Sequence, residues 1–181
     1  VVTHARFTDK TAFESNREYR AQIIVNDAAL NSKLEFKDFK WDVTAPDSAI
    51  TVPSASKIKA LALTSVSGTA TDTLGLAAMY ASSFSVKSLL TGQCFNPGNN
   101  SFTASCPFWV GTSSDVSSNW SFSQGSLNTA ILAYGDTWYT LLSRAIDSAQ
   151  NPQILFVDNI SSRTFLIDKT PPNTTVIFPV N

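Results

Sequence analysis

One sequence feature limits the possible folds of this chain more than any other: two distant segments carry the same ordered series of residues. The first part of the series keeps its spacings at an offset of 120 residues: Tyr19, Asp27 and Asn31, then Tyr139, Asp147 and Asn151. The second part reads Phe-x-x-Asp-x-Thr-x-Pro at an offset of 126 residues: Phe39, Asp42, Thr44 and Pro46, then Phe165, Asp168, Thr170 and Pro172. Repetition at a long period predicts one structural unit present more than once.

The repeated residues suit a β-hairpin. Along Tyr19–Asn26 and Thr137–Ile146, every second residue is apolar or small, which is the period of a strand with one buried face. We expect each tyrosine ring in a sandwich core, with its hydroxyl hydrogen-bonded to the backbone. Aspartate follows each strand as a turn residue. The prolines at the end of the series favour an extended, stiff connector.

The rest of the chain also predicts strands. Short runs rich in Val, Ile, Thr, Phe and Tyr alternate with turn residues, at spacings typical of a two-sheet antiparallel β-sandwich. Helical periodicity is limited to about two turns at Leu127–Tyr134, before Gly135. The other predicted strands are Leu34–Trp41, Ala49–Val52, Lys59–Ser67, Leu76–Leu90, Phe108–Val110, Asn119–Ser123 and Arg163–Asp168, and Val176–Phe178 begins one more.

Composition changes close to Pro46. Residues 1–45 hold seven acidic and seven basic residues, including every glutamate, although the whole chain is only 15% charged. We therefore predict closing strands of a preceding repeat at 1–45, a complete sandwich at 46–171, and the start of a following repeat or linker at 172–181. Closing strands alone bury too little apolar surface to be stable. Either the chain is a piece of a longer array, or another subunit supplies the missing strands.

This series resembles the end of bacterial immunoglobulin-like repeats, a group that includes fibronectin type III-like modules and occurs in tandem in large secreted and cell-surface proteins. The resemblance implies an all-β, immunoglobulin-like antiparallel β-sandwich. It also implies that the Tyr and Phe strands are its last two, and that Asp-x-Thr-x-Pro leads into the next domain. The chain departs from the family at Gln150, where a glycine is usual, and at Cys94 and Cys106.

Common catalytic patterns are absent. The chain has one histidine, His4, and two cysteines. It therefore has too few of the residues that zinc sites and Cys–His or Ser–His catalytic pairs require. The nucleophile-elbow, P-loop and dinucleotide-binding motifs do not occur. We therefore predict a protein that is not an enzyme and needs no cofactor.

The two cysteines, Cys94 and Cys106, flank a turn cluster at Asn96–Asn100. A disulfide across this excursion would add about 3 kcal/mol of stability in the chain-entropy estimate. Two buried free thiols are the alternative. The disulfide interpretation predicts an oxidising location, extracellular or at the cell surface.

Two candidate ligand sites compete with simpler structural explanations. Aspartates cluster near the predicted domain ends, where Ca²⁺ could rigidify a junction, although turn formation explains them as well: Asp27, Asp42, Asp47, Asp147 and Asp168. A platform for sugar rings could use aromatic residues that a strand core would also use: Trp109, Trp120 and Trp138, with Phe108.

The prediction that follows is a non-enzymatic structural or adhesive module of an extracellular multi-domain stalk or fibre. Its partners would be neighbouring immunoglobulin-like repeats in cis, or identical subunits joined by strand complementation. The alternatives are a carbohydrate- or protein-binding accessory module of a secreted enzyme, and a self-assembling filament subunit. Because the net charge is −1 and no long apolar run occurs, we predict that the chain neither binds nucleic acid nor inserts into a membrane.

Overall fold

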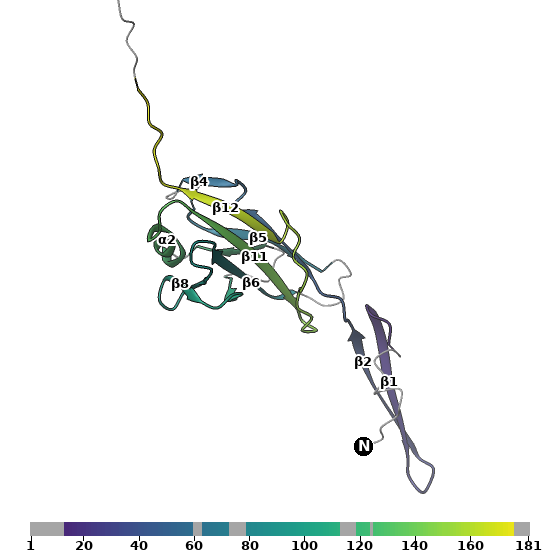
Figure 1. Cartoon of the computed structure of the whole chain (residues 1–181). Coiled ribbons are helices and arrows are strands. Elements are labelled where there is room, and N and C mark those ends of the chain that lie inside the picture. The colour runs from purple at the N-terminus through teal and green to yellow at the C-terminus, as the bar shows by residue number, and fades with distance from the viewer. Residues whose placement is uncertain (1–12, 60–62, 73–78, 113–118, 124, 176–181) are drawn as a thin grey trace, which may run out of the picture.

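The computed structural model describes residues 13–59, 63–72, 79–112, 119–123 and 125–175 (Figure 1). These residues form strands and loops, with one short helix, α2 (Gly125–Leu132). The strands make two sheets that pack face to face and a separate hairpin. The prediction of an all-β antiparallel sandwich is confirmed, with one parallel exception between β4 (Lys57–Lys59) and β12 (Ser162–Asp168).

The larger sheet has seven strands and is built around the long strand β11 (Thr137–Asp147). Side chains of β11 alternate between buried and less buried along its whole length, as the period-two pattern predicts. Its antiparallel neighbours are β12 and β6 (Met79–Ser88). The sheet continues beyond β6 through three short strands: β7 (Cys94–Asn96), β8 (Ser101–Ala104) and, paired directly with β6, β9 (Val110–Gly111).

The smaller sheet covers the inner face of the larger one. Its order is β10 (Asn119–Phe122), β5 (Val66–Thr71) and β3 (Asp47–Val52). Both sheets and α2 contribute to one core, and burial of its large side chains is the main source of stability. The largest of these side chains are Trp120, Tyr139, Phe84, Phe95, Phe102, Phe165 and Ile131.

A glycine allows close packing in the smaller sheet. A Cβ atom at Gly68 would clash with the Ala49 carbonyl oxygen and with the Trp120 ring. Trp120 therefore lies against β5, where its indole Nε1 donates a hydrogen bond to the Thr69 carbonyl oxygen at 3.1 Å. This contact anchors the Trp120 ring inside the core.

The hairpin of β1 (Arg17–Asn26) and β2 (Ser32–Trp41) lies outside the sandwich. All ten residues of β1 pair with β2, and neither strand joins another sheet. The hairpin projects from one end of the sandwich, while the backbone after β12 leaves from the opposite end as extended chain (Figure 1). The molecule is therefore elongated.

Most predicted strands occur close to their predicted bounds, but the single strand at Lys59–Ser67 is wrong. There the chain crosses between sheets: β4 ends at Lys59 in the larger sheet, and β5 begins at Val66 in the smaller one. Strands β7 and β8 were missed, because the turn residues between them dominate that stretch of sequence. Residues 60–62, 76–78 and Val176–Phe178 of the predicted strands lie outside the described residues.

The predicted helical segment at Leu127–Tyr134 is confirmed as α2, with Leu127, Ala130 and Ile131 buried. No helix in the described ranges is long and apolar enough to cross a membrane.

Candidate metal centre

The hairpins β1–β2 and β11–β12 make matched contacts at the repeated residues. Tyr19 lies directly opposite Phe39, and Tyr139 lies directly opposite Phe165. Both pairs of rings are stacked, with centroids 5.7 Å apart in the first hairpin and 5.8 Å apart in the second. The sequence series thus corresponds to a common local structure.

The turn after the tyrosine strand is also the same in both hairpins. The carboxylate of Asp27 accepts hydrogen bonds from the backbone and side-chain amides of Asn31, at 2.9 and 2.8 Å. Asp147 accepts the equivalent pair from Asn151, at 2.8 and 2.9 Å. Bonds from Asn31 hold the pKa of Asp27 below its usual value. In each turn the residue before the asparagine has a positive φ: Leu30 (67°) and Gln150 (69°).

That positive φ explains why a glycine is usual at the position of Gln150 in the resembling family. Glycine adopts left-handed backbone without a steric penalty, whereas other residues do so less readily. In this chain the turn forms with glutamine at that position.

Each hairpin ends in an Asp-x-Thr turn, which we call the clasp. In the first clasp the carboxylate oxygen Oδ1 of Asp42 accepts a hydrogen bond from the Thr44 amide at 2.9 Å. In the second clasp the same oxygen of Asp168 accepts one from the Thr170 amide at 3.0 Å. The two clasps therefore orient their aspartates in the same way relative to the outgoing chain.

The threonine of each clasp is tied back to the start of its hairpin. Asn16 donates a side-chain hydrogen bond to the Thr44 hydroxyl at 2.9 Å. In the second hairpin, the Thr170 hydroxyl donates to the Asp136 carboxylate at 2.6 Å. This bond, together with the Lys169 amide, lowers the pKa of Asp136.

Asp42 is the residue at which the hairpin meets the sandwich. Its backbone carbonyl accepts a hydrogen bond from the Asn151 side chain at 3.1 Å. The turn after β11 is thereby bonded to the connector between β2 and β3, residues 42–46. The residue is only 9% exposed, and its Oδ2 oxygen is buried without a hydrogen-bond partner among the described residues. An unpartnered buried carboxylate oxygen is unfavourable unless a cation or another donor compensates for it.

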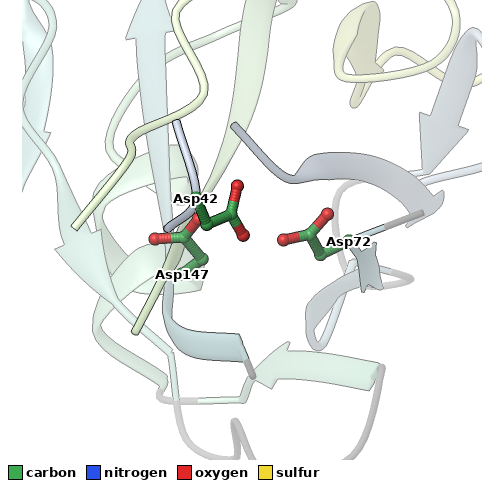
Figure 2. Close-up of side chains that lie close together, drawn as sticks. All are labelled: Asp42, Asp72 and Asp147. Carbon is green, nitrogen blue, oxygen red and sulfur yellow. The ribbon is translucent and has the colours of Figure 1, made fainter. Parts of the chain in front are cut away.

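Two further carboxylates lie close to that of Asp42. Asp72, which follows β5, points toward Asp42, and Asp147, at the end of β11, lies beside Asp42 (Figure 2). One carboxylate oxygen of each residue lies within 4.8 Å of the others. We call these three residues the Asp42–Asp72–Asp147 cluster.

The cluster has the donor chemistry and spacing of a site for a hard divalent cation. Ca²⁺ binds oxygen ligands at about 2.3–2.6 Å, so two ligands on opposite sides of the ion are about 5 Å apart. Oxygens within 4.8 Å of one another fit inside that shell. Ca²⁺ takes six to eight ligands, so backbone carbonyls or water would complete the coordination.

Of the five aspartates singled out in the sequence, the structure brings only Asp42 and Asp147 together. Asp27 lies in the hairpin turn, Asp47 begins β3, and Asp168 ends β12. Asp72 was missed. It directly follows Thr71, which pairs with Asp47 next to the connector, and only that strand pairing brings it to the site.

The three tryptophans do not share one exposed surface. Trp120 is 2% exposed in the core. Trp109 stacks on Phe156 with centroids 5.7 Å apart and lies under the Arg144 guanidinium at 4.3 Å. Trp138 is 43% exposed on β11. A sugar platform made of all three rings is therefore not formed, because Trp120 is inaccessible. Phe108 is 37% exposed.

The predicted Cys94–Cys106 disulfide is present and joins β7 to the segment after β8, with Cα atoms 5.2 Å apart. Cys94 is buried and Cys106 is exposed. The disulfide links the segment after β8 to β7 at the edge of the larger sheet. A disulfide is consistent with an extracellular or cell-surface location.

Comparison with family models and with curated proteins gave no match. Among solved structures, one similar chain is described as a Ca²⁺-stabilized adhesin that helps an Antarctic bacterium reach out and bind ice. It has 18% identity, a TM-score of 0.33, and coverage of 84% of this chain and 31% of that one. Another is the collagen-binding domain of Erysipelothrix rhusiopathiae surface protein RspB, with 6% identity, a TM-score of 0.18, and coverage of 90% and 62%.

This chain thus spans less than two thirds of the length of either structure. At these TM-scores the similarities do not establish a common fold or a common activity.

Proposed function

We propose that this chain is a structural module of an extracellular, multi-domain stalk, in which a hairpin of one sandwich is fastened by calcium to the next. The observation that carries the proposal is that β1–β2 has the internal contacts of β11–β12, yet lies outside the sandwich. The role is mechanical: joined sandwiches hold other domains at a distance from a surface, as adhesive proteins require.

The exposed face of β1–β2 supports this interpretation. In β11 the side chains of Tyr139, Leu141 and Ala145 are fully buried. The equivalent face of β1 leaves Ile23 60% and Val25 58% exposed. The positions opposite them on β2 are Glu35 and Lys33, so the apolar strip on this face lies along β1. A second layer over β1 would remove these apolar side chains from water.

The occupant we propose for this face is a three-stranded sheet like β3–β5–β10, from a preceding sandwich of the same architecture. The β11–β12 hairpin packs against such a sheet in this molecule. The sheet of a second copy is already covered by its own β11. Residues 1–45 would then close the preceding sandwich, residues 46–171 would form a complete one, and residues 172–181 would lead onward.

Calcium is the proposed ion of the Asp42–Asp72–Asp147 cluster. Three carboxylates brought together repel one another, and a divalent cation converts that repulsion into attraction. Because Asp42 belongs to the connector while Asp72 and Asp147 belong to the sandwich, the ion would link the two parts directly. Modules in extracellular fluid commonly bind Ca²⁺ with dissociation constants of about 10⁻⁴–10⁻³ M.

Calcium titration of the 181-residue chain tests this proposal. We expect one bound Ca²⁺ per chain by isothermal calorimetry, and stabilisation of about 2.7 kcal/mol at a calcium concentration 100 times the dissociation constant. The Asp42→Asn variant keeps the oxygen that accepts the Thr44 amide but removes the charge. It should lose calcium binding and be more stable than the wild type in chelator.

Asp168→Asn is the matched control, because it makes the same change in the second clasp, away from the cluster. It should bind calcium as the wild type does. Two results would contradict the calcium part of the proposal. One is a wild-type chain that binds no calcium at concentrations up to 10 times a dissociation constant of about 10⁻³ M. The other is an equal loss of calcium binding in Asp42→Asn and Asp168→Asn.

A further inference from the structure

A cavity of about 690 Å³ lies at the end of the sandwich where the chain leaves β12, opposite the end that carries the hairpin (Figure 1). Its lining comes from β4 (Lys57–Lys59), from Leu132 at the end of α2, and from residues 168–172, which we call the outgoing chain. Ligand pockets in proteins have volumes of about 300–1,000 Å³, so this cavity is large enough to hold a small molecule.

Much of the cavity wall is apolar. Ile58 and Leu132 both pack against the core and also line the cavity. Pro171 and Pro172 form part of the side that the outgoing chain contributes. Since proline has no amide N–H, these four residues offer contact area and no side-chain polar group. The apolar part of a ligand is favoured against such a wall, because contact removes its surface from water.

Two ammonium groups border the apolar wall. Lys57 and Lys59 are exposed, and none of the ion pairs among the described residues involves either of them. They lie two positions apart on β4, so their side chains leave the strand on the same side. Lysine on an edge strand such as β4 discourages pairing with another chain, but that role requires no cavity beside the strand.

The other charged groups of the lining leave one excess positive charge. Asp168 lies beside Lys59 in the parallel register of β12 and β4, so its carboxylate offsets one ammonium group. The Lys169 ammonium donates to the Leu132 carbonyl at 2.7 Å and also to that of Tyr134, where it compensates the negative end of α2. A ligand with a single negative charge therefore matches this cavity best.

We propose that the cavity binds a small amphiphilic anion, a molecule with one carboxylate and an apolar body. The carboxylate would lie within reach of Lys57 and Lys59, which can donate charge-assisted hydrogen bonds. The apolar body would lie against Ile58, Leu132 and the two prolines. The site uses no residue of the Asp42–Asp72–Asp147 cluster, so it stands or falls independently of the proposed calcium junction.

Titration of the 181-residue chain with hexanoate, followed by nitrogen-15 NMR, tests the site. We expect saturable shifts of the amides of Ile58, Leu132 and Thr170, all in the lining, with a dissociation constant of about 1 mM or lower. Hexan-1-ol lacks the charge and acetate lacks the apolar body. Each should therefore bind at least ~10-fold more weakly than hexanoate.

Two double variants separate this site from the effect of overall charge. Lys57→Gln with Lys59→Gln should weaken hexanoate binding at least ~10-fold, because both ammonium groups are removed from the cavity. Lys33→Gln with Lys37→Gln removes two ammonium groups from β2 in the separate hairpin and is the matched control, so it should bind hexanoate as the wild type does. Unchanged amide shifts along β11 report in each variant that the sandwich is folded.

Three results would overturn the inference. The first is the absence of a saturable shift at hexanoate concentrations up to about 10 mM, ten times the expected dissociation constant. The second is equal affinity for hexanoate and hexan-1-ol, which would mean that the lysines take no part. The third is an equal change of hexanoate affinity in the two double variants.

Discussion

Tyr19 and Tyr139 occupy equivalent positions, but their hydroxyl groups have different environments. The Tyr19 hydroxyl accepts a hydrogen bond from the Glu14 amide at 2.7 Å and contacts the Glu14 carbonyl oxygen at 3.3 Å, as the sequence predicted for a backbone partner. The Tyr139 side chain is fully buried, and its hydroxyl has no partner among the described residues. Burial raises the pKa of Tyr139 to about 12.

This pKa predicts a loss of stability in alkali. Between about pH 10 and pH 12 the unfolded chain releases the Tyr139 proton while the folded chain retains it, so the free energy of unfolding falls as pH rises. Tyr139→Phe should remove about 1 kcal/mol of that fall at pH 11, and should be at least as stable as the wild type at pH 7.

Urea denaturation at pH 7, 9 and 11 provides the measurement. The remaining tyrosines titrate in both proteins, so the difference between them reports Tyr139 alone. If the two proteins lost stability in parallel, the hydroxyl would be ionising as freely in the folded chain as in the unfolded one.

At the scale of elements, the two hairpins show how the same local structure can have different stability. The β1–β2 pair has ten residues in each strand in continuous register. Its outer face carries cross-strand ion pairs such as Arg20 with Asp38 at 2.6 Å, and exposed pairs of this kind add little. Only β11–β12 has a second sheet behind it, so its stability comes from the core.

Hydrogen exchange should separate the two hairpins. In the 181-residue chain, paired amides of β1–β2 should exchange ~1,000-fold faster than those of β11 paired with β6, because a lone hairpin opens without disturbing the sandwich. Mass spectrometry or NMR of the same sample provides both rates, with β11 as the internal reference. Equal protection would show that β1–β2 is already covered, and would contradict the proposed missing layer.

At the scale of the whole molecule, we expect the Asp42 junction to decide whether the hairpin and the sandwich move as one body. The connector is attached by the Asn151 bond to the Asp42 carbonyl and, in the proposal, by the ion. The hairpin projects away from the sandwich (Figure 1). In the proposal, a carboxylate–calcium link would add several short bonds to the connector.

Nitrogen-15 relaxation of the wild-type chain tests this coupling. With calcium, amides of β1–β2 and β11 should report one rotational correlation time. With chelator, the hairpin should tumble faster than the sandwich. Asp42→Asn should behave like the chelated wild type at all calcium concentrations, and calcium-independent coupling in the wild type would count against the ion as the fastener.

How much of this architecture is visible in the sequence depends on the range of the interactions. The hairpins were predictable because alternation, turn aspartates and the Asp-x-Thr clasp are local, each set by residues within a few positions of one another. The chain crossing between Lys59 and Val66 was not, because a period-two pattern does not say which sheet a strand joins.

The sequence alone determined that the chain is an all-β sandwich and that two of its segments share one residue series, and it pointed to the Cys94–Cys106 disulfide. Only the tertiary structure brought Asp72 to Asp42 and Asp147, and put Trp120 in the core instead of on a surface. The physical reason is the same in both cases. Side chains from distant strands become neighbours only when the sheets pack, and that packing depends on the whole core at once.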